Sequence, residues 1–525
     1  MSTYKQLYDQ LDQARGSMMS RLYDFSELTI PGLLPRTGHT QNAQLPVPYS
    51  SMPSRGVTRL ASRLVTALYP MNDVPFFELR LDLPVDIQQG TDPKGAYEIL
   101  GRIERRVTDK MSGTNLRSAL YTAMQHIIIV GDALLEVTED YTFAIHRVDN
   151  YVMRRRPDGE WFDMTVRTPV DCGALPQYLL DAGFENKERS AGDRFDQSAG
   201  EADAVFVHII KNSDGTSTYH REFDGRVFEE GTYDVCPFVP LGWNHIPGED
   251  YHRGLVEENW SDIRALDGLS ESLLDSVAAN AEFRFGVNPA GLTEIADIME
   301  SENGSFVPAA PNDVFPIQLA NQAQVGATQA AVTSKEQALG QVFLMNSASQ
   351  PTGERVTATQ VRVIASELEQ ALGGVFGSVS RSFQRPIIRR VMLQMVRDGI
   401  LVPEGAGAMD ELETALLMED GIMKIDVRSG LASLNREVEN DKMMQVMQVT
   451  AQLPPQATES INWPGMMDRW LATFGIETAG IVKSQEQMQQ EQMQAQQGQV
   501  AQAGAEAAAV QAGQAQEQPP QPPQG

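Results

Sequence analysis

The polar side chains of this chain do not form any short catalytic or nucleotide-binding motif. GxxxxGK[ST], HExxH, GxSxG and the EF-hand spacing are all missing, so the sequence predicts no P-loop, zinc protease site, nucleophile elbow or calcium loop. The seven histidines are scattered, and only His245 and His252 lie close together, near Glu249 and Asp250. A polar surface loop is the favoured interpretation over a metal site. Catalysis would need groups brought together from distant segments.

Three carboxylates recur at helical spacing in residues 255–281. Asp267, Glu271 and Asp275 stand at i, i+4 and i+8, with no cation between them. Such like-charge pairs each destabilise an isolated helix by about 0.2–0.5 kcal/mol. One interpretation is a solvated helix face. The other is a negative surface that DNA slides past, or one that meets basic groups of a neighbouring subunit.

A polar segment separates two strongly helical stretches. Residues 346–355 are rich in hydroxyl and amide side chains, which would contact phosphates weakly and without reading bases. An ordinary connector of this length is uncommon between two helices. Arg355 would pair locally with Glu354 or Glu367 if the segment is only a connector. A second basic feature, the triplet at residues 154–156, is typical of a turn and only weakly indicates nucleic-acid binding.

Length, composition and charge limit the class of protein. The 525 residues predict two to four structural regions, and 42% hydrophobic residues are enough to build a core. The net charge of −28 excludes a broad basic face for nucleic acid, although an acidic passage would repel DNA. Cys172 and Cys236 cannot make a disulfide framework, which fits synthesis in a reducing cytosol. We expect no signal peptide and no membrane span, because the most apolar stretch, 127–135, is short and contains Asp132.

The first 250 residues predict one α+β domain. Apolar residues recur at helical spacing near the N-terminus and after Ser54, and strict alternation in residues 77–83 indicates a strand. Two hairpins are indicated by Asp158-Gly159 and Asp224-Gly225. The expected elements are helices at 4–22, 54–68, 94–111 and 116–128, and antiparallel strands within 133–238.

The second half predicts mainly helices. Residues 255–281 and 325–345 are helical, and an irregular Pro-, Asn- and Gly-rich piece lies between them at 285–324. The most periodic helix starts at Thr357, with kinks expected at three glycines and one proline. Further helices continue to about residue 480. The Gln-rich tail, residues 484–525, is either disordered or a helix that forms only in an assembly.

Two stretches of the second half resemble the head-to-tail connector, or portal, proteins of podoviruses, which are short-tailed double-stranded DNA bacteriophages. Residues 288–293 read NPAGLT, which looks like the NPAG(I/L)T turn of that family. Residues 345–375 read MNSASQPTGERVTATQVRVIASELEQALGGV, which is similar to a long and irregular pattern of the same family. The resemblance extends over residues 1–480 and leaves the Gln-rich tail uncovered.

This resemblance implies an α+β, mainly helical portal fold whose copies form a ring around a central channel. The regions expected are a wing (1–250), two stem helices (251–284 and 325–345), a clip (285–324), a tunnel loop (346–356), a long kinked helix from wing to crown (357–400), a crown (401–483) and the tail (484–525). The tunnel-loop residues expected to contact DNA are Asn346, Ser347, Ser349, Gln350, Thr352 and Arg355. The acidic stem face would be Asp267, Glu271 and Asp275, and the clip turn Asn288, Pro289 and Gly291.

The resemblance also implies a function without catalysis, metal or cofactor. A ring of twelve subunits at one capsid vertex would pass double-stranded DNA during packaging, retain it and release it at ejection. Its partners would be the terminase, the tail adaptor, the scaffolding protein, the major capsid protein and internal core proteins. The protein would sit at the head-tail junction of the virion, after assembly in the host cytoplasm. The alternatives are a DNA-processing enzyme with dispersed catalytic residues and a tail-adaptor ring.

Overall fold

The computed structural model describes most of the first 401 residues and one later strand. The described residues are 3–36, 44–70, 77–81, 93–171, 173–186, 204–281, 284–291, 293–302, 304–306, 308, 311, 313–317, 322–345, 358–401 and 423–427. The chain divides into two units, 1–432 and 433–525, and every described residue belongs to the first. None of the described helices is long and apolar enough to cross a membrane.

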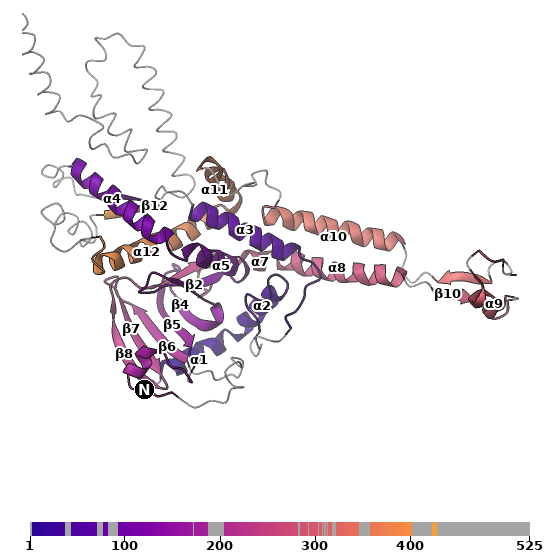
Figure 1. Cartoon of the computed structure of the whole chain (residues 1–525), viewed down its shortest axis with the longest axis horizontal. Helices are drawn as coiled ribbons and strands as arrows, with labels where there is room; N and C mark the ends of the chain where they lie inside the picture. The colour runs from indigo at the N-terminus through magenta and orange to yellow at the C-terminus, as the bar shows by residue number, and fades with distance from the viewer. Residues whose placement is uncertain are drawn as a thin grey trace, which may run out of the picture. The chain divides into compact units, whose positions relative to one another are not determined.

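The chain alternates between helical and β regions (Figure 1). In the first 250 residues the elements are α1 (Tyr4–Ala14), α2 (Gly16–Glu27), α3 (Met52–Leu68), β1 (Phe77–Leu81), α4 (Pro93–Ser112), α5 (Leu116–Ile129), β2 (Asp132–Val137), β3 (Phe143–His146), the 3-10 turn η1 (Val148–Asn150), β4 (Tyr151–Arg155), β5 (Trp161–Pro169), α6 (Gln177–Asp181), β6 (Ala204–Lys211), β7 (Ser217–Phe223), β8 (Arg226–Tyr233) and β9 (Phe238–Gly242). They are followed by α7 (Leu255–Glu258), α8 (Trp260–Ala281), β10 (Arg284–Val287), α9 (Ile295–Glu300), β11 (Val314–Ile317), α10 (Gln322–Val342), α11 (Ala358–Leu372), α12 (Gly374–Arg397) and β12 (Met423–Val427).

Antiparallel sheets confirm the predicted β region. Strands β4 to β8 form a five-stranded meander in chain order, and β2 lies between β3 and β9 in a second sheet. The two predicted hairpins are present as β4–β5 and β7–β8. Asp224 and Gly225 both have positive φ, at 51° and 76°, as a tight two-residue turn requires. The Asp-Gly turn therefore fits the β7–β8 hairpin as predicted, while in the longer β4–β5 connection only Gly159 has a positive φ, at 89°.

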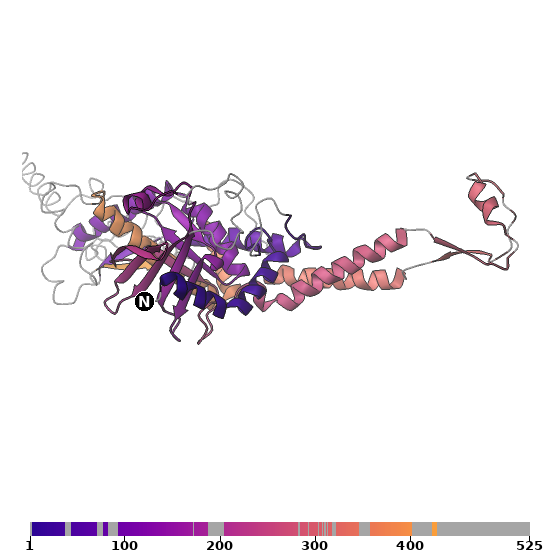
Figure 2. The same cartoon turned by 90° about the horizontal axis from the view of Figure 1, so that it is seen from below.

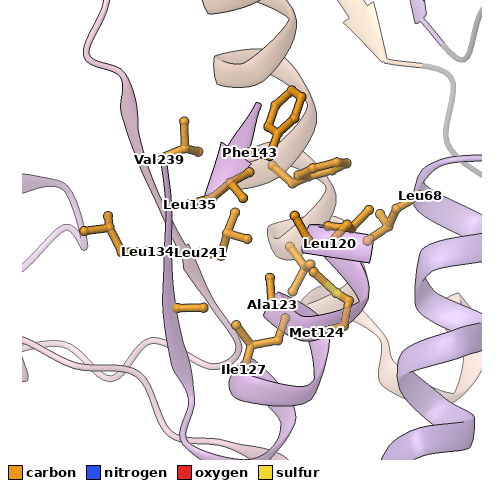
Figure 3. Packing of buried hydrophobic residues seen from close by; sticks show 14 of the residues in the cluster. Leu68, Leu120, Ala123, Met124, Ile127, Leu134, Leu135, Phe143, Val239 and Leu241 are labelled. Carbon is orange, nitrogen blue, oxygen red and sulfur yellow. The ribbon is translucent and has the colours of Figure 1, made fainter. Parts of the chain in front are cut away.

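The core of the body, by which we mean α1–α6 and β2–β9, lies around α5, which packs on α3 and on β2 and β9 (Figure 3). The apolar stripe predicted for α3 is buried in full, because α3 packs on α5 with that face. The side chains labelled in Figure 3 come from both helices and from the three-stranded sheet. They are Leu68, Leu120, Ala123, Met124, Ile127, Leu134, Leu135, Phe143, Val239 and Leu241.

Helices α8 and α10 run antiparallel, side by side, as one hairpin (Figures 1 and 2). Beyond their far ends, β10 and β11 pair antiparallel, and α9 lies in the connection between these strands. We call α8 with α10 the helical hairpin, and residues 284–317 the tip. α8 pairs chiefly with α10, and β10 pairs with β11.

Besides the division of the helix predicted over 4–22 into α1 and α2 at Arg15, two predicted helices are interrupted in the structure. The helix predicted over 255–281 is interrupted at Asn259, where φ is −111° and ψ is 18°, so α7 and α8 are separate. The helix predicted from Thr357 is divided at Gly373, whose φ is +55°, and it continues as α12 with Pro386 inside. A break near the glycines confirms the expected kink there. Nothing in the sequence around Asn259 signals the first break.

Candidate functional site

The predicted acidic face lies on α8, and its three carboxylates have different surroundings. Asp267 is half-buried and accepts hydrogen bonds from the backbone N–H groups of Tyr49 and Ser50, at 2.8 and 3.3 Å. Glu271 and Asp275 are exposed. One end of the column therefore holds backbone from a distant part of the chain, while the other end faces solvent.

The segment that meets this face is residues 44–51, which we call the strap. Tyr49 of the strap is hydrogen-bonded through its phenol to Glu271, and this bond together with the charge of Glu271 raises the pKa of Tyr49. The negative charges of Asp275 and Asp267 act in the same direction. The strap thus neutralises no carboxylate. It supplies donors to the acidic face and leaves the face negative.

The helical hairpin is closed near the body by apolar packing and one ion pair. Ile263 and Leu266 of α8 and Leu339 of α10 are fully buried. Lys335 of α10 reaches Asp262 of α8 at 2.7 Å, with both side chains more than a third exposed. Toward the tip the apolar side chains of α8 become exposed, as Leu274 at 56% and Val277 at 50%.

The clip turn predicted from the NPAGLT motif is organised around Asp313, which precedes β11. The buried carboxylate of Asp313 accepts hydrogen bonds from the N–H of Thr293, at 3.1 Å, and from its hydroxyl, at 2.9 Å. The N–H of Asn288 donates to the carbonyl of Asp313 at 2.9 Å. A Cβ at position 291 would overlap the Asp313 carboxylate, so glycine is required there. The motif therefore forms the binding site for the side chain of Asp313.

The turn has its own short-range support as well. The side-chain Oδ1 of Asn288 accepts the N–H of Ala290 at 3.1 Å, and the N–H of Gly291 donates to the carbonyl of Asn288 at 2.9 Å. Pro289 occupies the exposed corner. Sequence reasoning found these turn residues but missed Asp313. The signal was available, because Asp313 is the only ionisable residue between Glu302 and Lys335.

The tip exposes large apolar side chains on several of its elements. Phe306 is fully exposed, Phe285 is 62% exposed and Phe315 is 49% exposed. Met299 of α9 is 82% exposed. Exposed apolar groups that gather in this way are typical of contact surfaces.

The six predicted tunnel-loop residues, Asn346 to Arg355, lie outside the described residues. So do the tail and the predicted crown, apart from residues 401 and 423–427. The structure does describe both ends of that segment. Leu344 follows α10, and its carbonyl accepts a hydrogen bond from Arg63 of α3 at 3.0 Å. Glu367 of α11 forms an ion pair with the same arginine. One of the two carboxylates proposed as partners for Arg355 is therefore bound to Arg63.

Most of the other polar features singled out from the sequence have structural partners, whereas both ring nitrogens of His245 are buried without a hydrogen-bond partner among the described residues. Arg154 pairs with Asp163, and Arg155 contacts buried Asp132 at 3.3 Å. His252 binds the same carboxylate through Nδ1 at 2.8 Å. Burial raises the pKa of Asp132, but His252 and Arg155 outweigh it and hold the pKa below its usual value. Within the described ranges, no group of three His, Cys, Asp or Glu side chains is arranged to hold a metal ion.

Comparison with known proteins gives one family and several relatives. Residues 1–482 match the family described as bacteriophage head to tail connecting protein. The portal protein of Escherichia phage T7 is 29% identical over 92% of this chain and 89% of its own length, and that of Enterobacteria phage T3 is 29% identical with the same coverage. The portal protein of Pseudomonas phage phiKMV is 28% identical over 90% of this chain and 91% of its own length.

Proposed function

The chain belongs to the bacteriophage head to tail connecting proteins, and on that premise we propose that it is the portal of a short-tailed double-stranded DNA phage. The observation that carries this is the match over residues 1–482, together with portal relatives aligned over 90% or more of the chain. The protein forms a ring through which the genome enters and leaves the head. The chain itself makes and breaks no bond.

The parts of the portal are assigned to the described elements by their order along the chain. The body is the wing, the helical hairpin is the stem and the tip is the clip. Residues 346–356 are the tunnel loop, residues 357–400 lead from wing to crown, and residues 401–483 form the crown. The pairing of α8 with α10 and of β10 with β11 supports this division, because a stem and a clip must each extend as a unit that meets neighbouring copies.

Twelve copies make the ring, and its surfaces bind different partners. The exposed apolar side chains of the tip support its role as the docking site for the terminase and later for the tail adaptor. Scaffolding protein, major capsid protein and internal core proteins contact the remaining surfaces. The ring assembles in the host cytoplasm and resides at the head-tail junction of the virion.

The exposed end of the acidic face contributes by repelling the genome. Glu271 and Asp275 carry charge of the same sign as DNA phosphates, so DNA that passes them finds no counterion to displace and does not bind. Asp267 serves the strap instead, through its two backbone hydrogen bonds. This restricts the repelling surface to two of the three carboxylates predicted from the sequence.

DNA packaging into heads whose portal carries reversed charges at Glu271 and Asp275 tests this assignment. Glu271→Lys with Asp275→Lys should leave rings intact and stall DNA filling, because the lysines would bind phosphates and resist sliding. Glu139→Lys with Asp140→Lys is the matched control, since it makes the same charge change at two exposed positions of the body. Normal DNA filling with the first variant would refute the proposal that Glu271 and Asp275 repel the genome, and it would not affect the proposal that the protein forms a ring. Absence of rings from the wild-type protein would remove the portal proposal itself.

A further inference from the structure

Helix α10 ends in a conformation that L-amino acids rarely adopt. Leu344 has φ at +55°, in the left-handed region normally taken by glycine at the end of a helix. The N–H of Met345 donates to the carbonyl of Gly340 at 2.8 Å, and the N–H of Leu344 donates to the carbonyl of Gln341 at 3.1 Å. These two bonds form a Schellman cap. A leucine in this position needs support from outside the helix.

That support comes from Arg63, a buried residue of α3 that lies 281 positions earlier in the chain. Its Nη1 donates to the carbonyl of Leu344 at 3.0 Å, and its Nη2 pairs with the carboxylate of Glu367 on α11. One guanidinium group thereby joins the end of α10 to α11. These are the two helices that flank residues 346–357 in the chain.

Packing differs on the two sides of this arginine. On the α10 side, Phe343 is fully buried, and a Cβ at Gly56 of α3 would lie only 2.6 Å from its ring, so α3 and the end of α10 are in close contact. On the α11 side a hollow of about 360 Å³ remains beside the ion pair. Its lining consists of Arg63, Leu344, Glu367, Gln370 and Ala371. Elsewhere α3 and α11 are in contact, and Ile364 and Leu368 of α11 are fully buried, so the ion pair lies beside a packed contact between these two helices.

We propose that Arg63 is a positioning residue that ties the end of α10 to Glu367, in the C-terminal half of α11, and so holds together the two helices on either side of residues 346–357. The consequence of this positioning for DNA rests on the proposed function, in which residues 346–356 contact DNA. The link fixes the separation between the two helices that this segment connects. Its loss would let α11 shift toward the hollow and would loosen the grip on packaged DNA.

The chemistry of arginine suits this role better than that of lysine. A guanidinium group is planar and donates in two directions at once, so it can bind a carbonyl and a carboxylate together. A lysine at position 63 would have a single ammonium group and would have to favour one acceptor. Arg55, two turns earlier on the same helix, is exposed.

Hydrogen exchange in full-length rings tests the proposal directly. Arg63→Met removes the donors and keeps an unbranched side chain of similar length. We expect amides in the last turn of α10 and in α11 to exchange about tenfold faster, the factor that follows from losing a charge-assisted hydrogen bond. Arg63→Lys should give an intermediate rate. Arg55→Met, the matched control on the same helix, should leave these amides as they are in the wild type.

A second variant keeps the test decisive if Arg63→Met does not fold. Glu367→Gln removes only the ion pair, so exchange should rise in α11 and not at the end of α10. Unchanged exchange in both Glu367→Gln and Arg63→Met would overturn the proposal. Faster exchange spread over the whole body would also overturn it, because that is the result of general destabilisation.

DNA retention separates this proposal from the proposed function. Heads built with Arg63→Met rings should lose packaged DNA more readily than heads built with Arg55→Met rings. If exchange changes as expected and retention does not, Arg63 remains a positioning residue, and the assignment of residues 346–356 as a DNA-contacting loop fails. If neither changes, the positioning role is rejected whatever the function of the segment.

Discussion

The body and the helical hairpin with its tip use apolar side chains in opposite ways. In the body, Leu64, Ile127 and Leu135 are fully buried among neighbours from helices and strands. In the helical hairpin and the tip, Leu274 is 56% exposed and Phe285 is 62% exposed. The body therefore completes its own core, and the other region leaves apolar surface that its own chain does not cover.

This difference indicates where the single chain is sufficient and where it is not. Burial of apolar side chains is the main source of folding free energy, so the body has the means to fold as one chain. The hairpin and tip have a small buried set and many exposed apolar groups, which neighbouring subunits and docked proteins would cover in a ring.

The largest expected effect comes from making the same truncation in both regions. Leu64→Ala should lower the free energy of unfolding by about 3 kcal/mol, because it removes buried methyl groups and leaves a cavity. Leu274→Ala should lower it by less than about 1 kcal/mol, since that side chain is already half in solvent. Denaturant unfolding of the two variants measures the difference. Equal losses would contradict the contrast between the regions.

Leu274→Ala should instead act on assembly. We expect a larger share of free subunits after dilution, because the truncated side chain no longer packs between copies. Sedimentation velocity at several concentrations measures this share. Leu64→Ala should leave assembly unchanged under conditions where it stays folded, which makes the two variants controls for each other.

Acid should lower the free energy of unfolding of the body, by an amount close to that expected for Leu64→Ala. Burial, with a smaller effect from the charge of Arg147, lowers the pKa of His126 to about 4. The folded state keeps this histidine neutral, while the unfolded chain protonates it near its usual pKa of about 6.5. The unfolded state therefore binds more protons between these values, and stability falls by about 3 kcal/mol as pH drops through that interval.

Melting temperatures between pH 7 and pH 4 check this expectation. His126→Leu should remove most of the change in melting temperature with pH that His126 causes. His220→Gln, a change at a half-buried histidine, should leave that pH dependence in place. The helical hairpin and the tip contain no histidine, so their exchange rates should respond less over the same interval. If His126→Leu does not alter the pH dependence of the melting temperature, the acid sensitivity comes from other groups.

The sequence allowed prediction of the parts of this fold that depend on local patterns. The apolar stripe of α3, the Asp-Gly turns and the division of the long helix at Gly373 all follow from neighbours within a few residues. The break at Asn259 and the role of Asp313 were missed. Asp313 was identifiable only as an isolated charge, because its partner Thr293 lies 20 positions earlier.

The contacts of the candidate site were beyond prediction for the same reason. The strap meets α8 across 218 positions of sequence, and Arg63 meets Leu344 across 281. Arg55, Arg59 and Arg63 recur at equal spacing on α3, and no local pattern distinguishes the one that is buried. Which of these side chains meets a partner depends on how α3 packs against α10 and α11.

Removing the acceptor of the clip turn should have a smaller, local effect. Asp313→Ala leaves the N–H and hydroxyl of Thr293 without their acceptor, at an expected cost of about 2 kcal/mol. Hydrogen exchange in peptides covering residues 284–317 should rise while the body is unaffected. Asp297→Ala, at an exposed position on α9, is the control. Equal exchange in both variants would show that Asp313 does not organise the turn.

The smallest effect is expected for the ion pair of the helical hairpin. Lys335→Met should change the free energy of unfolding by about 0.5 kcal/mol or less, because both partners are partly exposed and water screens their charges. Thermal melting at low and high salt measures it, and wild type and variant should converge at high salt. A loss of several kcal/mol would mean that the hairpin depends on this pair more than on Ile263 and Leu266.

Electron microscopy of the purified full-length protein tests the portal assignment most directly. We predict end-on views of a closed ring with a central hole wide enough for a DNA duplex, and class averages with twelve-fold symmetry. In such rings the exposed apolar side chains of α8 and the tip should lie against neighbouring copies. Compact monomers or dimers at micromolar concentration would contradict the portal assignment and the explanation given for the exposed apolar surface.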